Sequence, residues 1–209
     1  MARITEPVCR LCRREGMKLF LKGIRCTGDK CAVERRNYAP GQHSKNMRRK
    51  LSNYGVQLRE KQKAKRIYGM LERQFRIFFQ QSARKRGVTG ENLIQLLERR
   101  LDNVVFRLLW VTSRAEGRQL VNHGSVHVNG RKVDIASFLV QANDVIELRK
   151  DDTLVKRIGQ TLELLKDRTI PDWLTLDRET LQAKVLRLPT KADAGIPVEE
   201  SQIVELYSK

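Results

Sequence analysis

The sequence predicts an α+β fold: an N-terminal knot of four cysteines around a metal, a helical domain, and an inserted small α/β module of two helices on a short antiparallel sheet. Three observations predict it. All four cysteines lie between residues 9 and 31. Apolar residues recur at helical spacing through the middle of the chain. Near residue 129, alternating apolar residues flank an Asn-Gly pair, which is typical of a β-hairpin.

The charge of the chain is strongly uneven. It has 42 Lys and Arg against 24 Asp and Glu, a formal net charge of +18. Residues 1–100 hold 26 cations and 8 acids, whereas residues 101–209 hold 16 of each. This excess predicts a polyanionic partner and salt-dependent binding to nucleic acid. No membrane span, membrane-lying helix or signal peptide is recognisable, so we expect a cytosolic protein without a membrane partner.

The cysteines form two closely spaced pairs. Cys9 and Cys12 make a C-x2-C pair, and Cys26 and Cys31 make a C-x4-C pair, with thirteen residues between the two pairs. Each pair can reach one ion from a tight turn, so the pattern predicts a structural four-thiolate site, with neighbouring cations lowering the thiol pKa values. One zinc ion suits this ligand set, and an iron–sulfur cluster is the alternative. Disulfides or unligated thiols are the other interpretations.

A basic segment broken by Pro and Gly follows at residues 35–50. Segments of this composition usually become ordered only against nucleic acid, where rings stack on bases and cations meet phosphates; the alternative is a solvated tail. Its candidate RNA contacts are Arg35, Arg36, Tyr38, His43, Arg48, Arg49 and Lys50.

Residues 56–81 are predicted to be helical. Ile67, Leu71, Phe75 and Phe78 follow one another at spacings of four, four and three, which places them on one buried face. The cations on the other faces outnumber the acids that can pair with them, so we expect a phosphate-binding platform. Its candidate RNA contacts are Arg59, Lys61, Lys63, Arg66 and Arg73.

A helix–helix–hairpin unit is predicted after a basic link at residues 82–90. Apolar residues from 93 to 108 fall on one face of a long helix. Ser113 and Glu116 form a capping box for a second helix, and Asn129-Gly130 turns a hairpin. The unit contributes further candidate RNA contacts: Arg114, Arg118, His123, Asn129, Arg131 and Lys132.

The remaining elements complete a predicted division into parts. Residues 144–148 alternate like a third strand, residues 153–165 have helical spacing, and Trp173 is expected to be buried. The predicted parts are a metal-binding arm at 1–45, a helical RNA-binding domain at 46–97 on which the tail 175–209 packs back, and the RNA-binding module at 98–174.

Several long segments match one known family in order and spacing. They are the cysteine pattern, PGQHSKNMRRKLSNYGVQLREKQKAKRIYGMLERQFR at 40–76, TGENLIQLLERRLDNVVFRL at 89–108, the hairpin unit and the final IVELYSK. The chain resembles the bacterial ribosomal protein S-four family of the small (30S) subunit, in its cysteine-containing, zinc-binding form. Ser44 stands where that family is expected to have glycine, a departure that concerns local loop shape.

The resemblance implies a non-enzymatic, cytoplasmic ribosomal protein that binds the 5′ domain junction of small-subunit (16S) ribosomal RNA and nucleates subunit assembly. It implies ribosomal protein S-five as a neighbour, at an interface linked to translational accuracy, and S-three near the channel by which mRNA enters. Repression of its own operon is a further candidate role. No small-molecule substrate is expected.

Two other classes remain as alternatives. An RNA-modification enzyme is one, because the hairpin module also accompanies catalysts; the histidines at 43, 123 and 127 lie in no catalytic motif. A sequence-specific DNA or RNA regulator built on the cysteines is the other, although no clear recognition helix follows them. Binding compared across ribosomal RNA, unrelated RNA and duplex DNA discriminates between these classes.

Overall fold

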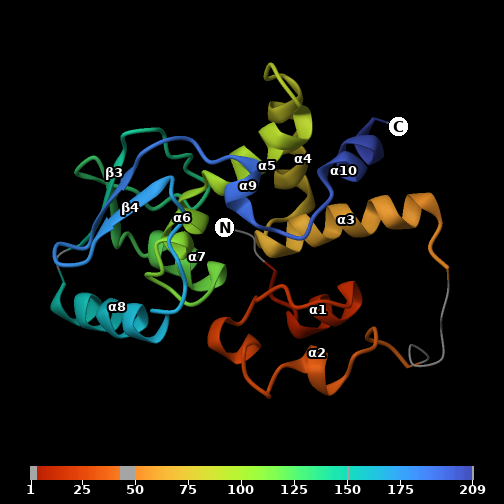
Figure 1. The fold of residues 1–209 in the computed structure, drawn as a ribbon, viewed down its shortest axis with the longest axis horizontal. Coiled ribbons are helices and arrows are strands. Elements are labelled where there is room, and N and C mark those ends of the chain that lie inside the picture. Colours follow the sequence, from red (N-terminus) through yellow and green to blue (C-terminus); the bar gives the residue numbers. More distant parts are fainter. Residues whose placement is uncertain (1–3, 43–49, 150, 209) are drawn as a thin grey trace. The chain divides into compact units, whose positions relative to one another are not determined.

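The fold was analysed in a computed structural model that describes residues 4–42, 50–149 and 151–208 (Figure 1). It divides the chain into two compact units, Met1–Leu93 with Ile196–Lys209, and Ile94–Gly195. Three of the predicted RNA contacts, His43, Arg48 and Arg49, lie outside the described residues. None of the helices within those ranges is long and apolar enough to cross a membrane.

The first unit is helical in the part of the chain that the structure describes. Its elements are α1 (Cys9–Glu15), a short 3-10 helix (Gly23–Cys26), α2 (Ala32–Arg35), α3 (Asn53–Ile67), α4 (Glu72–Ala83), the start of α5 (Thr89–Glu98) and α10 (Glu200–Tyr207). The C-terminal helix α10 packs on α3. The ring of Tyr207 stacks on Phe79 of α4 with centroids 4.4 Å apart. The end of the chain therefore closes the helical core.

The predicted helix over 56–81 is two helices. Gly69 takes a left-handed backbone (φ 63°) between α3 and α4, which ends the first helix. Tyr68 and Met70 on either side of it are buried, so the break is stabilised by the core. Ile67 and Phe75 are also buried, and the apolar spacing therefore continues across the break. This continuity explains why the pattern indicated one helix.

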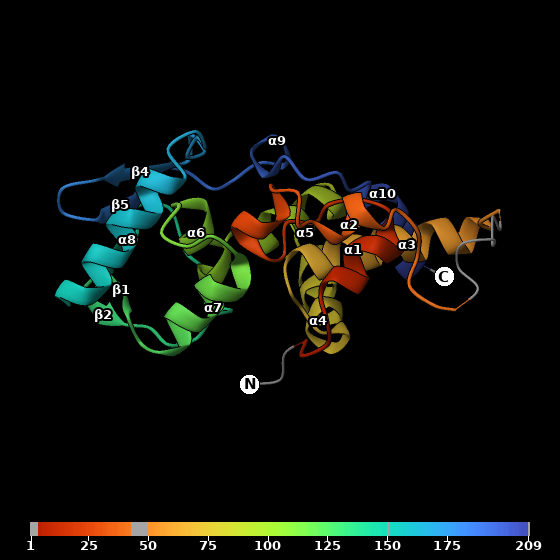
Figure 2. The same ribbon diagram turned by 90° about the horizontal axis from the view of Figure 1, so that it is seen from below.

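The second unit is a sheet with helices packed on it (Figure 2). Its elements are α6 (Leu101–Arg107), α7 (Arg114–Asn122), β1 (Val126–Val128), β2 (Arg131–Lys132), β3 (Val145–Leu148), α8 (Asp152–Leu164), β4 (Leu174–Asp177), β5 (Gln182–Val185) and α9 (Lys191–Ala194). The strand order is β2-β1-β3-β5-β4, and every neighbouring pair is antiparallel. The predicted hairpin, third strand and helix at 153–165 are confirmed as β1–β2, β3 and α8.

Two features of this unit differ from the prediction. The long helix is divided into α5 and α6, because the backbone of Arg99 and Leu101 bonds to Val140 and Phe138. The strands β4 and β5 were not predicted; each is four residues long and buries only alternate positions. Residues 175–195 consequently belong to the sheet-containing unit, and only Ile196–Lys209 joins the helical one, which corrects the boundary placed at 174.

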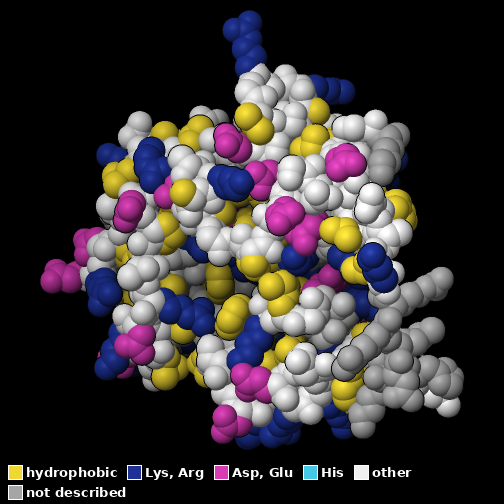
Figure 3. All heavy atoms as spheres, turned by 45° about the vertical axis from the view of Figure 1, so that its right-hand side comes forward, with side chains coloured by type: hydrophobic (Ala, Val, Ile, Leu, Met, Phe, Trp, Pro, Cys, Tyr) yellow, Lys and Arg dark blue, Asp and Glu magenta, His cyan; other side chains and the backbone are white. Residues whose placement is uncertain are grey.

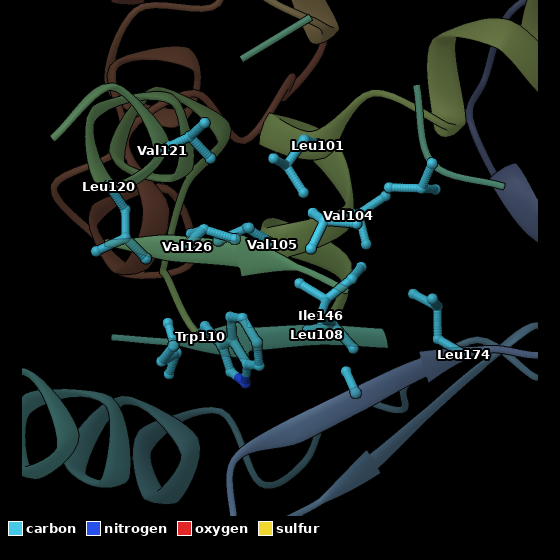
Figure 4. Close-up of a cluster of buried hydrophobic side chains, with 14 of the residues drawn as sticks. Leu101, Val104, Val105, Leu108, Trp110, Leu120, Val121, Val126, Ile146 and Leu174 are labelled. Atoms are coloured by element: carbon cyan, nitrogen blue, oxygen red, sulfur yellow. The ribbon is translucent and has the colours of Figure 1, made fainter. Parts of the chain in front are cut away.

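The core of the second unit joins α6 to the sheet (Figure 4). Leu101 and Val104 of α6, and Leu108 directly after it, pack with Ile146 of β3, all with no exposed surface. Trp110 and Trp173 belong to the same cluster and are 1% and 0% exposed, which confirms the predicted burial of Trp173. This core holds α6 against the sheet to which the β1–β2 hairpin belongs.

Candidate RNA-binding surfaces and cysteine cluster

The four cysteines line one small cavity. Cys9 and Cys12 come from α1, Cys26 ends the 3-10 helix, and Cys31 directly precedes α2. All four are free thiols, and three of them are buried. The cavity has a volume of about 20 Å³ and is also lined by three cations, Lys22, Arg25 and Lys30. The structure thus brings together the residues that the spacing paired.

Two of the thiols accept backbone hydrogen bonds. The N–H of Lys22 donates to Sγ of Cys26 at 3.3 Å, and the backbone of Leu19 bonds to Cys12. Such donors stabilise a thiolate. Burial nevertheless raises the pKa of the Cys12 thiol, so the expected lowering by nearby cations does not hold there. Within the described ranges, no group of three or more His, Cys, Asp or Glu side chains is arranged as a metal site.

The α1 helix is tied to α3 by a buried carboxylate. Oε1 of Glu15 accepts from Nη1 of Arg59 at 3.3 Å and from Nη1 of Arg66. The Glu15 side chain is 1% exposed. Burial raises the pKa of Glu15 in spite of the two cations. Two predicted RNA contacts are therefore engaged in holding the cysteine-rich segment.

The other cations of α3 are also paired. Lys61 and Lys65 lie 2.6 and 3.0 Å from the carboxylate oxygens of Glu72, and Lys63 pairs with Glu60. All five cationic side chains of α3 are between 11 and 27% exposed. Every cation of α3 is thus in contact with a carboxylate, although only three carboxylates serve the five cations.

Glu72 is the centre of this second set of contacts. Its Oε1 also accepts the hydroxyl of Tyr207 at 3.0 Å. Partial burial would raise the pKa of Glu72, but the hydrogen bonds from Lys61, Lys65 and Tyr207 outweigh it and lower that pKa to about 2. Burial and the same hydrogen bond raise the pKa of Tyr207. Glu72 therefore links α3, α4 and the C-terminal helix.

Arg114 and Arg118 of α7 lie against α6. Nε of Arg114 donates to Oδ1 of Asn103 at 2.7 Å, and its guanidinium lies over the Phe106 ring, 4.4 Å from the centroid. Arg118 is 12% exposed at its side chain and 3.9 Å from Asp102. These two arginines share a face as predicted, but that face packs on the neighbouring helix.

Only one of the two hydrogen bonds of the predicted capping box forms at the N-terminus of α7. Oγ of Ser113 accepts the N–H of Glu116 at 3.3 Å. The Glu116 carboxylate instead accepts the N–H of Thr112 at 2.9 Å and pairs with Arg157 of α8. The carboxylate therefore joins two helices of the unit.

The hairpin tip presents its cations to solvent. Asn129 (φ 51°) and Gly130 (φ 75°) both have positive φ, as the predicted type I′ turn requires. The Asn129 side chain accepts the N–H of Val145 at 2.9 Å and donates to Asp144 at 2.8 Å, so it fixes the turn to β3. Arg131 and Lys132 are exposed, as is the predicted contact His123. A rigid, exposed basic edge results.

The described part of the basic arm has mixed surroundings. Tyr38 lies beneath the guanidinium of Arg13, which is 4.8 Å from its ring centroid. Arg35, Arg36 and Lys50 are all exposed, and Arg35 also donates to the carbonyl of Asp29 at 3.1 Å. Tyr38 is thus already stacked within the protein.

The structure also exposes cations outside the predicted set. Those that lie together are Arg76 in α4 and the run Arg84, Lys85 and Arg86 in the following turn. The run SARKRG carried a signal for them, but it was interpreted as a link between parts.

A basic helical unit and a hairpin unit with an exposed cationic edge define an RNA-binding protein. Residues 3–98 match the family described as Ribosomal protein S4/S9 N-terminal domain, and residues 99–146 match the S4 domain. The chain is 56% identical to small ribosomal subunit protein uS4 of Thermoanaerobacter sp. (strain X514), 54% to that of Dictyoglomus turgidum and 56% to that of Pelobacter propionicus. Each similarity covers 100% of both chains.

The chain therefore belongs to the uS4 family of small-subunit ribosomal proteins. As a member of that family it is a structural protein of the small ribosomal subunit that binds ribosomal RNA, and it is not an enzyme.

Proposed function

We propose that this chain binds directly to the 5′ domain junction of small-subunit (16S) ribosomal RNA and nucleates assembly of the subunit. The observation that carries the proposal is the exposed edge of Arg131 and Lys132, which Asn129 holds rigidly on β3. Cations carried on an ordered turn lose less conformational freedom on binding phosphates than cations on a flexible segment. A second basic unit on the same chain would make a second contact, and two contacts recognise the shape of a junction.

Competition between nucleic acids tests this function. The full chain is bound to a 5′ domain RNA fragment, to an unrelated structured RNA and to duplex DNA at near-physiological salt. We expect a preference for the first that survives excess competitor tRNA. Equal affinity for all three, with one steep salt dependence, would indicate non-specific charge attraction and overturn the proposal.

The proposal extends to neighbours in the subunit. These are ribosomal proteins S-five and S-three, mRNA near the channel by which it enters, and a contribution with S-five to translational accuracy. Translational autorepression belongs to the same extension. Family membership is what supports these roles. Cross-linking of the chain within reconstituted small subunits tests the contacts, and recovery of neither protein would remove them.

We also propose that Cys9, Cys12, Cys26 and Cys31 hold one zinc ion, with an iron–sulfur cluster as the alternative. The shared cavity and the N–H donors to Cys12 and Cys26 support a thiolate set. Within the described ranges the thiols are not arranged as a metal site, so binding an ion would require them to rearrange. Four thiolates leave no open position, so a bound ion would act as a cross-link between α1 and α2.

Metal content tests the second proposal. The protein is purified without oxygen, and zinc, iron and acid-labile sulfide are measured together with the visible spectrum. About one zinc per chain and no colour would establish the zinc site. Iron and sulfide with visible absorption would establish the cluster. Protein that folds and binds RNA without either would overturn metal binding.

A further inference from the structure

Exposed cations follow one face of α4 and continue into the turn before α5. This α4 stripe consists of Arg73, Arg76, Arg84, Lys85 and Arg86. At helical spacing, Arg73, Arg76 and Arg84 fall within an arc of about 80°. They span roughly 16 Å along the helix axis. The opposite face of α4 is buried through Phe75, Phe78 and Ser82. The stripe is thus supported from behind by the core of the first unit.

The turn that ends the stripe is held in one conformation. The side-chain amide of Asn92 donates to the carbonyl of Arg86 at 3.2 Å. The N–H of Lys85 bonds to the carbonyl of Ser82 at 3.2 Å, and the buried Ser82 hydroxyl donates to Phe79 at 2.7 Å. Figure 3 shows Lys and Arg side chains projecting from the tip where α4 ends. The cations therefore project from a braced turn.

Folding does not account for the charge of the stripe. Over the described ranges, Arg73, Arg76, Arg84 and Arg86 form no ion pair, whereas every cation of α3 does. Arg84 follows the C-terminus of α4, where a cation stabilises the helix dipole. Arg86 precedes the N-terminus of α5, where a cation destabilises it. These four arginines are therefore available to an anionic partner outside the protein.

We propose that the α4 stripe binds the sugar–phosphate backbone of folded RNA and is the contact that the first unit makes with it. The inference rests on the proposed ribosomal RNA binding and assigns that unit's contact to α4 and its turn instead of α3. Guanidinium groups recognise phosphate oxygens in paired geometry. A protein interface of stable size needs an apolar centre, and the stripe offers only the separate exposed residues Ile77 and Val88 within the described chain.

Matched triple variants of the full chain test the stripe. One carries Arg73→Gln, Arg84→Gln and Arg86→Gln. The control carries Lys156→Gln, Lys166→Gln and Arg178→Gln, which removes the same charge from exposed positions in the second unit. Affinity for the 5′ domain RNA fragment is measured over a range of salt. We expect the stripe variant to bind about 30-fold more weakly. Its log–log salt slope should fall by about 3, roughly one per cation.

The outcomes separate this inference from the function on which it rests. Equal losses in the stripe and control variants, with unchanged thermal unfolding, would overturn the stripe. So would an intact RNA affinity combined with failure to join assembling subunits, because that result would indicate a protein partner. If the unsubstituted chain shows no preference for the ribosomal fragment, the proposed function fails. A selective loss in the stripe variant on every RNA would still support phosphate binding at α4.

Discussion

The helix α3 and the α4 stripe carry five cations each, yet only in α3 does every cation contact a carboxylate, three carboxylates serving the five cations. Its partners are Glu60 within the helix, Glu72 at the start of α4, and Glu15, which is 44 residues from Arg59 in the sequence. Four members of the stripe have no such partner among the described residues. A count of cations on a helix therefore does not identify its RNA contacts. The position of the acids in the fold decides which cations remain available.

Replacing the buried carboxylate of Glu15 should have the largest effect and tests the pairing of α3 most directly. The raised pKa of Glu15 reflects the cost of burying its own charge, but Glu15→Gln leaves the guanidinium groups of Arg59 and Arg66 without a counter-charge. Because the unpaired charges dominate the cost, we expect the free energy of unfolding to fall by about 3 kcal/mol. Urea unfolding followed by far-UV circular dichroism measures it. The matched control is Glu34→Gln, whose pair with the solvent-exposed Lys18 should contribute little to stability. Equal effects of the two changes would mean that Glu15 does not bind α1 to α3.

The hairpin edge should behave like the stripe. Arg131→Ala with Lys132→Ala should weaken binding to the 5′ domain RNA about tenfold and lower the salt slope by about 2, because both side chains are exposed. Filter binding at several salt concentrations checks this. Arg118→Ala serves as the contrast, since its loss should lower the melting temperature more than the affinity. An unchanged affinity of the double variant would remove the hairpin from the RNA contacts.

Lowering the pH should remove the stability that Glu72 contributes through its contacts with the α3 cations. Glu72 has a pKa lowered to about 2 from an ordinary 4.5, so its contribution is present above about pH 4.5 and is lost as the pH falls towards 2. The side chain is 46% exposed, and solvent screening reduces that contribution to about 1 kcal/mol. Glu72→Gln should abolish this part of the pH dependence of stability between pH 5 and pH 2. Parallel curves for the two proteins would contradict the role assigned to Glu72.

Single substitutions of one stripe cation and one α3 cation should have the smallest effects, but they compare the two helices most directly. Arg73→Gln should lower the salt slope of RNA binding by about 1, whereas Lys65→Gln should leave it unchanged, because Lys65 is 16% exposed and paired with Glu72. Both variants lose one charge, so the difference isolates its position. Equal slopes for the two would show that pairing within the protein does not control availability.

Local signals predicted the elements that depend on few residues. The hairpin followed from Asn129 and Gly130, whose positive φ values are set by their own chemistry. The helix breaks at Gly69 and Arg100 were not predicted, because apolar spacing continues through both. The break at Arg100 is stabilised by a segment about 40 residues away in sequence, since Val140 donates to the carbonyl of Arg99.

The candidate sites were predicted to a similar extent. The spacing of the four cysteines was enough to predict that they lie together, and they line one cavity. The pairing of α3 was not visible in the sequence, because Glu15 and Glu72 reach that helix only through the tertiary fold. The exposed run from Arg84 to Arg86 was visible as charge, but its braced geometry depends on Asn92 and on the buried Ser82.

The two buried indole side chains allow the two units to be distinguished by spectroscopy. Trp110 and Trp173 are its two tryptophans, and both lie in that unit's core. All four tyrosines, at positions 38, 54, 68 and 207, belong to the first unit. Selective excitation of indole therefore reports the loosening of the sheet-containing unit, and tyrosine absorbance reports the helical one. The native protein thus carries a separate spectroscopic label in each half, so that the order in which the halves melt can be followed without an added dye.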